Sequence, residues 1–158
     1  MSPLINKPVK NIKSFARSIQ IIHLAMTLGL LLFIGFTWGK LTTLEMRHSS
    51  TKVVEYIFPV LFVLIIGLGN FLKKRILTTV KKKESLHKKL QLFQTAHIIE
   101  MASVEGIGFA STALYMVFEN VIFLGLALLA IAVLSLRFPT TDRIAQSIGL
   151  TIEEQAYF

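Results

Sequence analysis

One carboxylate, Glu105, lies within an otherwise apolar stretch of the sequence. If that stretch crosses a membrane, an ionised carboxylate is costly there, and such residues usually face a bundle interior, a partner or a water path. A carboxyl group in this setting can exchange a proton or bind a cation. It can also stay neutral, because burial favours the uncharged form, and then donate a hydrogen bond that holds two helices together. Glu105 is therefore either an ion-exchanging group or a structural one.

Two polar residues could be partners of Glu105. Thr112 falls on the same stripe of a helix, because seven residues make about two helical turns. Asn70 lies in another apolar segment and could reach the carboxyl group from a neighbouring helix. Thr27 or a backbone carbonyl could take the same place if the role of Glu105 is structural.

Glu100 and His97 form a second polar group on the same segment. They are three residues apart and are therefore neighbours on the surface of a helix. We expect Glu100 close to the membrane interface, in an ion pair with Lys88, Lys89 or His97. The two residues are a second candidate for ion or proton binding, and they are less informative than Glu105.

His97 also has a counterpart in His23. Both are predicted at similar depth on parallel spans, where two facing imidazoles could ligate a b-type haem. No further His or Cys supports such a site, so we expect neither a cofactor nor a metal. The sequence contains no phosphate loop, nucleophile–base pair or cluster of metal ligands, and we expect the protein not to be an enzyme.

The apolar residues come in blocks that predict membrane helices. Hydrophobic residues make up 53% of the 158, and three blocks of 17 to 22 residues contain no charged residue. About 20 apolar residues cross a membrane as a helix, whereas an isolated strand cannot satisfy its backbone in lipid. We predict an all-α, four-transmembrane-helix bundle, a single membrane domain over residues 1–158, with spans at about residues 19–38, 54–72, 96–118 and 120–136.

The basic residues predict the orientation of these spans. Four precede the first span, eight lie in the segment Lys73–Lys89 between the second and third spans, and two lie in the tail, residues 137–158. Only three lie on the other side. The positive-inside rule then places both termini and the middle segment in the cytoplasm.

The segment Lys73–Lys89 accounts for most of the net charge of +8. In a membrane protein such a segment is typical of contact with anionic lipid headgroups, and we expect no nucleic-acid partner. Apolar residues at roughly helical spacing indicate that the helices continue past the membrane surface as a basic, amphipathic cytoplasmic hairpin. In the tail, the residues around Pro139 break the helix, Gly149 suits a helix end, and Thr151–Glu154 has a capping-box pattern.

Small residues form a stripe beside Glu105. At four-residue spacing they let another helix approach closely, as in small-xxx-small packing. The protein is therefore expected to be a homo-oligomer or a subunit of a membrane complex. The residues of this stripe are Ala102, Gly106, Ala110 and Ala113.

A weak internal repeat relates the two halves of the chain. Ile19–Leu24 is similar to Phe93–Ile98, and Ile57-Phe58 matches Ile122-Phe123. Such a repeat indicates two parallel helical hairpins related by an axis along the membrane normal.

The segment Ile98–Ala110, IIEMASVEGIGFA, resembles the carboxylate-bearing helix of the rotary-ATPase proteolipid (c) subunit. The resemblance implies that Glu105 alone would be the carboxylate that binds H⁺ or Na⁺. The chain departs from that family in having only Gly67 and Gly69 in its second span, and in having two additional spans.

The whole chain resembles small four-helix membrane proteins of Bacteroidetes-type bacteria, a group with no assigned activity. The similar features are Phe93–Ile99, the step Glu105-Gly106, the turn Glu119-Asn120 and the tail segment Arg137–Ile144. This resemblance implies a bacterial inner-membrane location. Two functional hypotheses follow: a proton- or cation-handling membrane protein that uses Glu105, or a structural or accessory subunit of a larger membrane complex.

Overall fold

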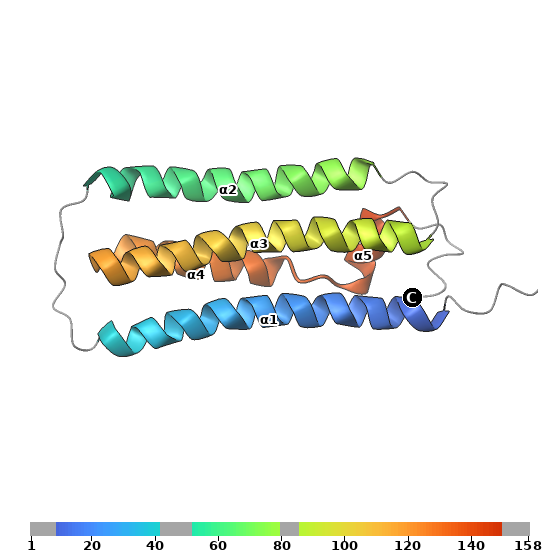
Figure 1. The fold of residues 1–158 in the computed structure, drawn as a ribbon, viewed down its shortest axis with the longest axis horizontal. Coiled ribbons are helices and arrows are strands. Elements are labelled where there is room, and N and C mark those ends of the chain that lie inside the picture. Colours follow the sequence, from blue (N-terminus) through green and yellow to red (C-terminus); the bar gives the residue numbers. More distant parts are fainter. Residues whose placement is uncertain (1–8, 42–51, 80–85, 150–158) are drawn as a thin grey trace, which may run out of the picture.

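The computed structural model describes residues 9–41, 52–79 and 86–149 of the chain. In these ranges the structure is all α, with no strand, which confirms the all-α part of the predicted fold class (Figure 1). The five helices are α1 (Val9–Leu41), α2 (Lys52–Thr78), α3 (Leu86–Phe118), α4 (Val121–Leu136) and α5 (Thr141–Ser147).

Three helices are long and apolar enough to cross a membrane, namely Ser14–Thr37 within α1, all of α2 and all of α3. The helix α4 has 16 residues. It meets the same test only together with α5, from which it is bent by 81°. The described residues thus contain three helices able to span a membrane, or four if the bent pair is one span.

The four long helices lie side by side along the long axis of the molecule, with α3 in the middle (Figure 1). The helix α3 packs against α1, α2 and α4. Because α1 and α3 begin at the end of the bundle where α2 and α4 finish, Lys73, Lys88 and Arg137 gather there. We call this end the basic end.

Helices approach each other closely at two glycines. A Cβ atom at Gly108 of α3 would lie 2.6 Å from Leu30 Cδ2 and 3.0 Å from Ala130 Cβ, so α1 and α4 both press against this position. A Cβ atom at Gly69 of α2 would lie 2.8 Å from the Cβ of Ser103. Each glycine therefore permits a helix–helix contact that a larger residue would push apart.

Two apolar cores follow one another along the bundle. The larger core joins α1 to α4 and includes Leu30, Met101 and Phe123. The smaller core joins the first turns of α1 and α3 to α5 at the basic end; its buried members are Ala16, Ile19, Leu90, Phe93, Ile144, Ala145 and Ile148. Between the two cores, α1 and α3 carry buried polar side chains, which we call the polar layer: His23, His97 and Glu100.

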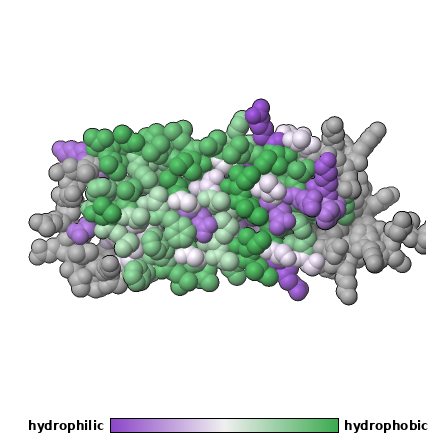
Figure 2. All heavy atoms as spheres, in the orientation of Figure 1, coloured by the Kyte–Doolittle hydropathy of each residue, from purple (hydrophilic) through white to green (hydrophobic). Residues whose placement is uncertain are grey.

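The apolar outer surface of the bundle ends at the level of this layer. Large exposed apolar side chains begin at Ile21 on α1 and continue to Leu72 on α2 and Leu136 on α4. In the view of Figure 2, hydrophobic residues cover most of the visible face, and hydrophilic residues gather toward the basic end. Exposed apolar surface this extensive suits lipid rather than water.

Beyond the polar layer the helices continue, as the sequence predicts. The helix α2 extends past Leu72 to Thr78, and α3 begins at Leu86. Lys89 in this part is buried, whereas Lys88 is exposed. The residues between the two helices, 80–85, lie outside the described part of the chain.

The short connections at both ends of α4 carry side-chain caps. At its start, Glu119 adopts a positive φ of 54°, and the Asn120 side chain accepts a hydrogen bond from the backbone N–H of Ile122. At its end the chain turns at Pro139, and the hydroxyl of Thr140 accepts the N–H of Arg143 at 3.4 Å to cap α5. The predicted capping box further along the tail lies outside the described residues.

Candidate functional site

The buried carboxylate of Glu100 is the centre of the polar layer. Its side chain is 4% exposed, and Lys73 Nζ of α2 lies 2.6 Å from Oε2. Arg137 Nη1, at the end of α4, lies 3.1 Å from Oε1. One carboxylate on α3 therefore joins the ends of α2 and α4.

The sequence places these three charges at one level. Lys73 directly follows the last apolar residue of the second charge-free block, and Arg137 directly follows the last apolar residue of α4. Both cations are mostly buried, with side chains 24% and 21% exposed. Removing charges from water is costly, and close opposite charges offset that cost. Since two cations face one carboxylate, the three groups together carry an excess of one positive charge.

The Arg137 contact is an ion pair without an aligned hydrogen bond. Arg137 Nη1 is buried and has no hydrogen-bond acceptor with acceptable geometry, although Oε1 of Glu100 lies 3.1 Å away. Lys73, by contrast, both pairs with and hydrogen-bonds to Glu100. The Arg137 guanidinium thus has unused hydrogen-bonding capacity.

The imidazole of His97 lies between two other rings. The Phe93 ring stacks on it at 5.7 Å between centroids, and the His23 ring stacks at 5.5 Å with an interplanar angle of 17°. Nδ1 of His97 is 3.7 Å from Glu100 Oε2, which is too far for a hydrogen bond. Both His97 nitrogens and Nδ1 of His23 are buried without a hydrogen-bond partner in the described residues.

This arrangement of histidines does not fit a haem held between them. Two axial ligands must point a nitrogen at the same iron from opposite sides. His23 and His97 instead turn their ring faces toward each other. The described residues also contain no group of three or more His, Asp or Glu side chains placed to hold a metal ion.

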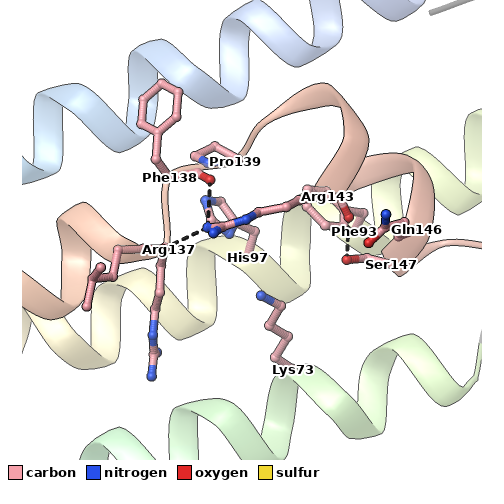
Figure 3. A pocket seen from close by; sticks show the side chains of 10 residues that line it. Lys73, Phe93, His97, Arg137, Phe138, Pro139, Arg143, Gln146 and Ser147 are labelled. Carbon is pink, nitrogen blue, oxygen red and sulfur yellow. Dashed lines mark hydrogen bonds between the residues drawn. The ribbon is translucent and has the colours of Figure 1, made fainter.

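A pocket of roughly 190 Å³ opens beside the polar layer, between α2, α3, α4 and α5 (Figure 3). Lys73 extends into it from α2, while the Arg143 guanidinium approaches from the α5 side (Figure 3). Nη1 of Arg143 donates hydrogen bonds to the carbonyls of Leu136 at 2.7 Å and Phe138 at 3.3 Å. The lining residues are Lys73, Phe93, His97, Leu136, Arg137, Phe138, Pro139, Arg143, Gln146 and Ser147.

Glu105 lies five residues further along α3, roughly 7.5 Å beyond Glu100 in the direction of the apolar zone. Its side chain is half-buried. A Cβ atom at Gly29 of α1 would lie 3.8 Å from Oε1 of Glu105, so the carboxyl group faces α1. Within the described residues, no ion pair or hydrogen bond neutralises this carboxyl group.

The structure does not join the predicted partners to Glu105. Thr112 is buried, and its hydroxyl donates to the carbonyl of Gly108 at 3.0 Å. The Thr27 hydroxyl likewise bonds to its own helix, at the carbonyl of His23. Asn70 is half-buried on α2. The helix α2 contacts α3 near Ser103, and Ser103 points about 200° around α3 from Glu105, so Asn70 lies on a different side of α3 from Glu105.

The predicted stripe of small residues lies on the outside of α3. Ala102, Gly106 and Ala113 are exposed and Ala110 is half-buried. A Cβ atom at Gly106 would meet nothing within 4 Å. At Gly106 the stripe therefore packs against no helix of the described chain, whereas Ala110 packs partly against the larger core.

Sequence reasoning missed the roles of Lys73, Arg137 and Arg143. The first two had a usable signal, because each is the first cation after an apolar block, at the depth expected for Glu100. The position of Arg143 had none, since it depends on how the tail folds back. Of the predicted Glu100 partners, His97 lies nearby at 3.7 Å.

Comparisons of the chain with models of protein families, with curated proteins and with solved structures give no match. The functional interpretation therefore depends on the geometry of the site. That geometry contains two membrane carboxylates of different kinds. Glu100 is neutralised by fixed cations, and Glu105 has no such partner among the described residues.

Proposed function

We propose that this protein handles protons or monovalent cations in a membrane, with Glu105 as the exchanging group. The observation that supports this most is the contrast between the two carboxylates of α3. Glu100 is held by two cations, so its charge state is tied to the folded structure. Glu105 is half-buried among apolar helices and has no neutralising side chain in the described residues, so a proton or a cation has to fill that role.

The surroundings of Glu105 agree with an exchanging group. The close Gly29 on α1 leaves the carboxyl oxygens uncovered by a side chain at that position. The exposed Gly106 lies next to it on α3 and leaves space on the outer side. A carboxyl group that is neither locked in an ion pair nor fully enclosed can gain and lose its proton without disrupting the fold.

Flux measurements on the purified full chain in sealed liposomes test this proposal. With an imposed pH or Na⁺ gradient, wild-type protein should dissipate the gradient faster than empty liposomes. Glu105→Gln keeps the size and polarity of the side chain but removes its charge, and flux should fall to the level of empty liposomes. Glu119→Gln removes a carboxylate in the turn between α3 and α4 and serves as the matched control, with flux unchanged.

Two results would contradict the proposal. One is a Glu105→Gln protein that conducts like wild type. The other is wild-type protein that, although correctly reconstituted, adds no flux for H⁺ or Na⁺. Circular dichroism and elution profile should show that both variants remain folded, so that lost flux is assigned to the carboxyl group.

We further propose that the basic end faces the cytoplasm of a bacterium and that the apolar zone crosses the inner membrane as four spans, the bent α4–α5 pair included. Fourteen of the seventeen Lys and Arg residues on the predicted inner side support the orientation. The predicted 2+2 repeat has support in the histidines. His23 and His97 hold matched positions in the two halves, and their rings stack across α1 and α3.

A second candidate function is that of a structural or accessory subunit. The exposed side of α3 at Ala102, Gly106 and Ala113 supports it, because small residues on an outer face allow close approach of a helix from another molecule. The two candidates are compatible if Glu105 exchanges its ion at such a contact.

A further inference from the structure

We propose that the pocket between α2, α3, α4 and α5 binds the phosphate headgroup of an anionic phospholipid. The proposal is independent of ion exchange at Glu105. It also places headgroup binding at a folded site, whereas the sequence predicts it along the linear segment Lys73–Lys89.

The charge of the site favours an anion. Lys73, Arg137 and Arg143 line the pocket, and Glu100 beside it is the one carboxylate paired with two of them. Three cations against one anion leave an excess of two positive charges. The acidic residue of α5, Asp142, is exposed and does not line the pocket.

The hydrogen-bonding groups of the site also favour an acceptor-rich ligand. His97 lines the pocket with a side chain only 4% exposed, yet neither of its nitrogens has a hydrogen-bond partner in the described residues. Arg143, which lines the pocket, uses only Nη1 in these side-chain hydrogen bonds to two backbone carbonyls, which fix the position of the guanidinium. Buried polar groups nearly always have a partner, and phosphate oxygens bind to Arg and Lys particularly well.

The shape and edge of the pocket distinguish a lipid headgroup from a larger soluble anion. Its volume of roughly 190 Å³ is below the range of pockets that enclose drug-sized ligands, about 300–1,000 Å³. Leu136 in its wall is 75% exposed, and Phe138 is 38% exposed. Leu136 belongs to the apolar surface of α4 that ends here, so acyl chains can lie along that surface while the phosphate group occupies the pocket.

Gln146 offers a mild test of this site. It lines the pocket on α5 and is exposed, and its side-chain amide makes no hydrogen bond within the described residues. Gln146→Glu is nearly isosteric and adds one negative charge to the wall. Gln91→Glu makes the same change on an exposed position of α3 at the basic end, outside the pocket lining, and is the matched control.

Native mass spectrometry of the full chain in detergent measures the binding. Phosphatidylglycerol should bind at least about fivefold more tightly than phosphatidylcholine, because the choline cation is repelled by the excess positive charge. Gln146→Glu should weaken phosphatidylglycerol binding about fivefold, and Gln91→Glu should leave it within about twofold of wild type. Arg143→Lys, which keeps the charge, should retain more binding than Arg143→Gln.

Three outcomes would overturn the assignment. Equal affinity for the two lipids would show that the pocket does not select an anionic headgroup. Equal weakening by Gln146→Glu and Gln91→Glu would show general attraction to the basic end instead of a site. A separate arm measures thermal protection by inorganic phosphate alone. Full protection by inorganic phosphate, with no added protection by phosphatidylglycerol, would assign the pocket to free phosphate.

Discussion

At the scale of single residues, Glu100 and Glu105 show how neighbours determine the role of a membrane carboxylate. Both lie on α3, five residues apart, so they point about 140° apart around the helix. Glu100 turns toward the ends of α2 and α4 and meets Lys73 and Arg137. Glu105 turns toward Gly29 of α1, and no cation among the described residues pairs with it. The first carboxylate is thus a structural anchor, and the second is the better candidate for exchange.

Loss of the Glu100 charge should destabilise the folded protein. Glu100→Gln leaves Lys73 and Arg137 mostly buried with no anion between them, and removing one member of a buried ion pair typically costs about 3 kcal/mol. Thermal unfolding in detergent should show a clearly lower midpoint for this variant.

The interaction can be separated from a general loss of packing by a double-mutant cycle. Adding Lys73→Met to Glu100→Gln removes one of the two unpaired cations and should recover part of the lost stability. Independent, additive effects of the two substitutions would contradict the assigned ion pair.

At the scale of elements, α3 is the central helix, and its two glycines lie on faces with different surroundings. Gly108 faces inward, where Leu30 and Ala130 approach closely, whereas Gly106 faces outward. The two positions are two residues apart and so lie on opposite sides of the helix. Their residue types are identical, and only the neighbouring helices distinguish them.

Alanine substitutions should separate the two glycines. In Gly108→Ala the new Cβ atom would lie 2.6 Å from Leu30 Cδ2 and 3.0 Å from Ala130 Cβ, so these atoms must move apart. The overpacking should lower the free energy of unfolding by about 1–3 kcal/mol. Gly106→Ala meets nothing within 4 Å and should be neutral or slightly stabilising, because alanine favours helix by up to about 1 kcal/mol. Thermal unfolding of both variants measures the difference. Equal shifts of the unfolding midpoint in the two variants would contradict the close packing assigned to Gly108.

At the scale of the whole molecule, the bundle has two apolar cores with the polar layer between them, and α3 has an exposed outer face. The smaller core packs α5 and the start of α1 against α3. The basic end is therefore a folded part of the protein, and it forms the wall of the pocket. The outer face of α3 is the place where the contact proposed for an accessory subunit would lie.

Gly106→Leu tests contact through that face without disturbing the chain itself. Gly106 is exposed on the outer side of α3 and an added Cβ atom meets nothing within 4 Å, so folding should be retained. Crosslinking in native membranes should show a complex for wild type and a loss of at least about half of it for Gly106→Leu. Leu substitution at Gly125, an exposed position of α4 with nothing within 4 Å of its Cβ, is the matched control. An undiminished complex in Gly106→Leu would rule out the stripe as the interface.

The helices could be predicted from the sequence alone, because the signals that mark them are local. Charge-free blocks predicted the apolar zone, the turn at Glu119-Asn120 and the break at Pro139 marked the ends of α4, and the excess of basic residues marked one end of the bundle. These features depend on neighbours in the chain. The residues at which a helix begins and ends can be predicted from these local features without knowledge of what the helix packs against.

Only the tertiary structure decided which carboxylate is neutralised and which glycine is enclosed. Lys73 and Glu100 are 27 residues apart in the chain, and Arg137 and Glu100 are 37 apart, so no local pattern pairs them. Helical periodicity sorted the residues of α3 into stripes, but the stripe that packs is decided by where α1, α2 and α4 lie around it. The energies that select a partner act through space, and the sequence alone does not contain those distances.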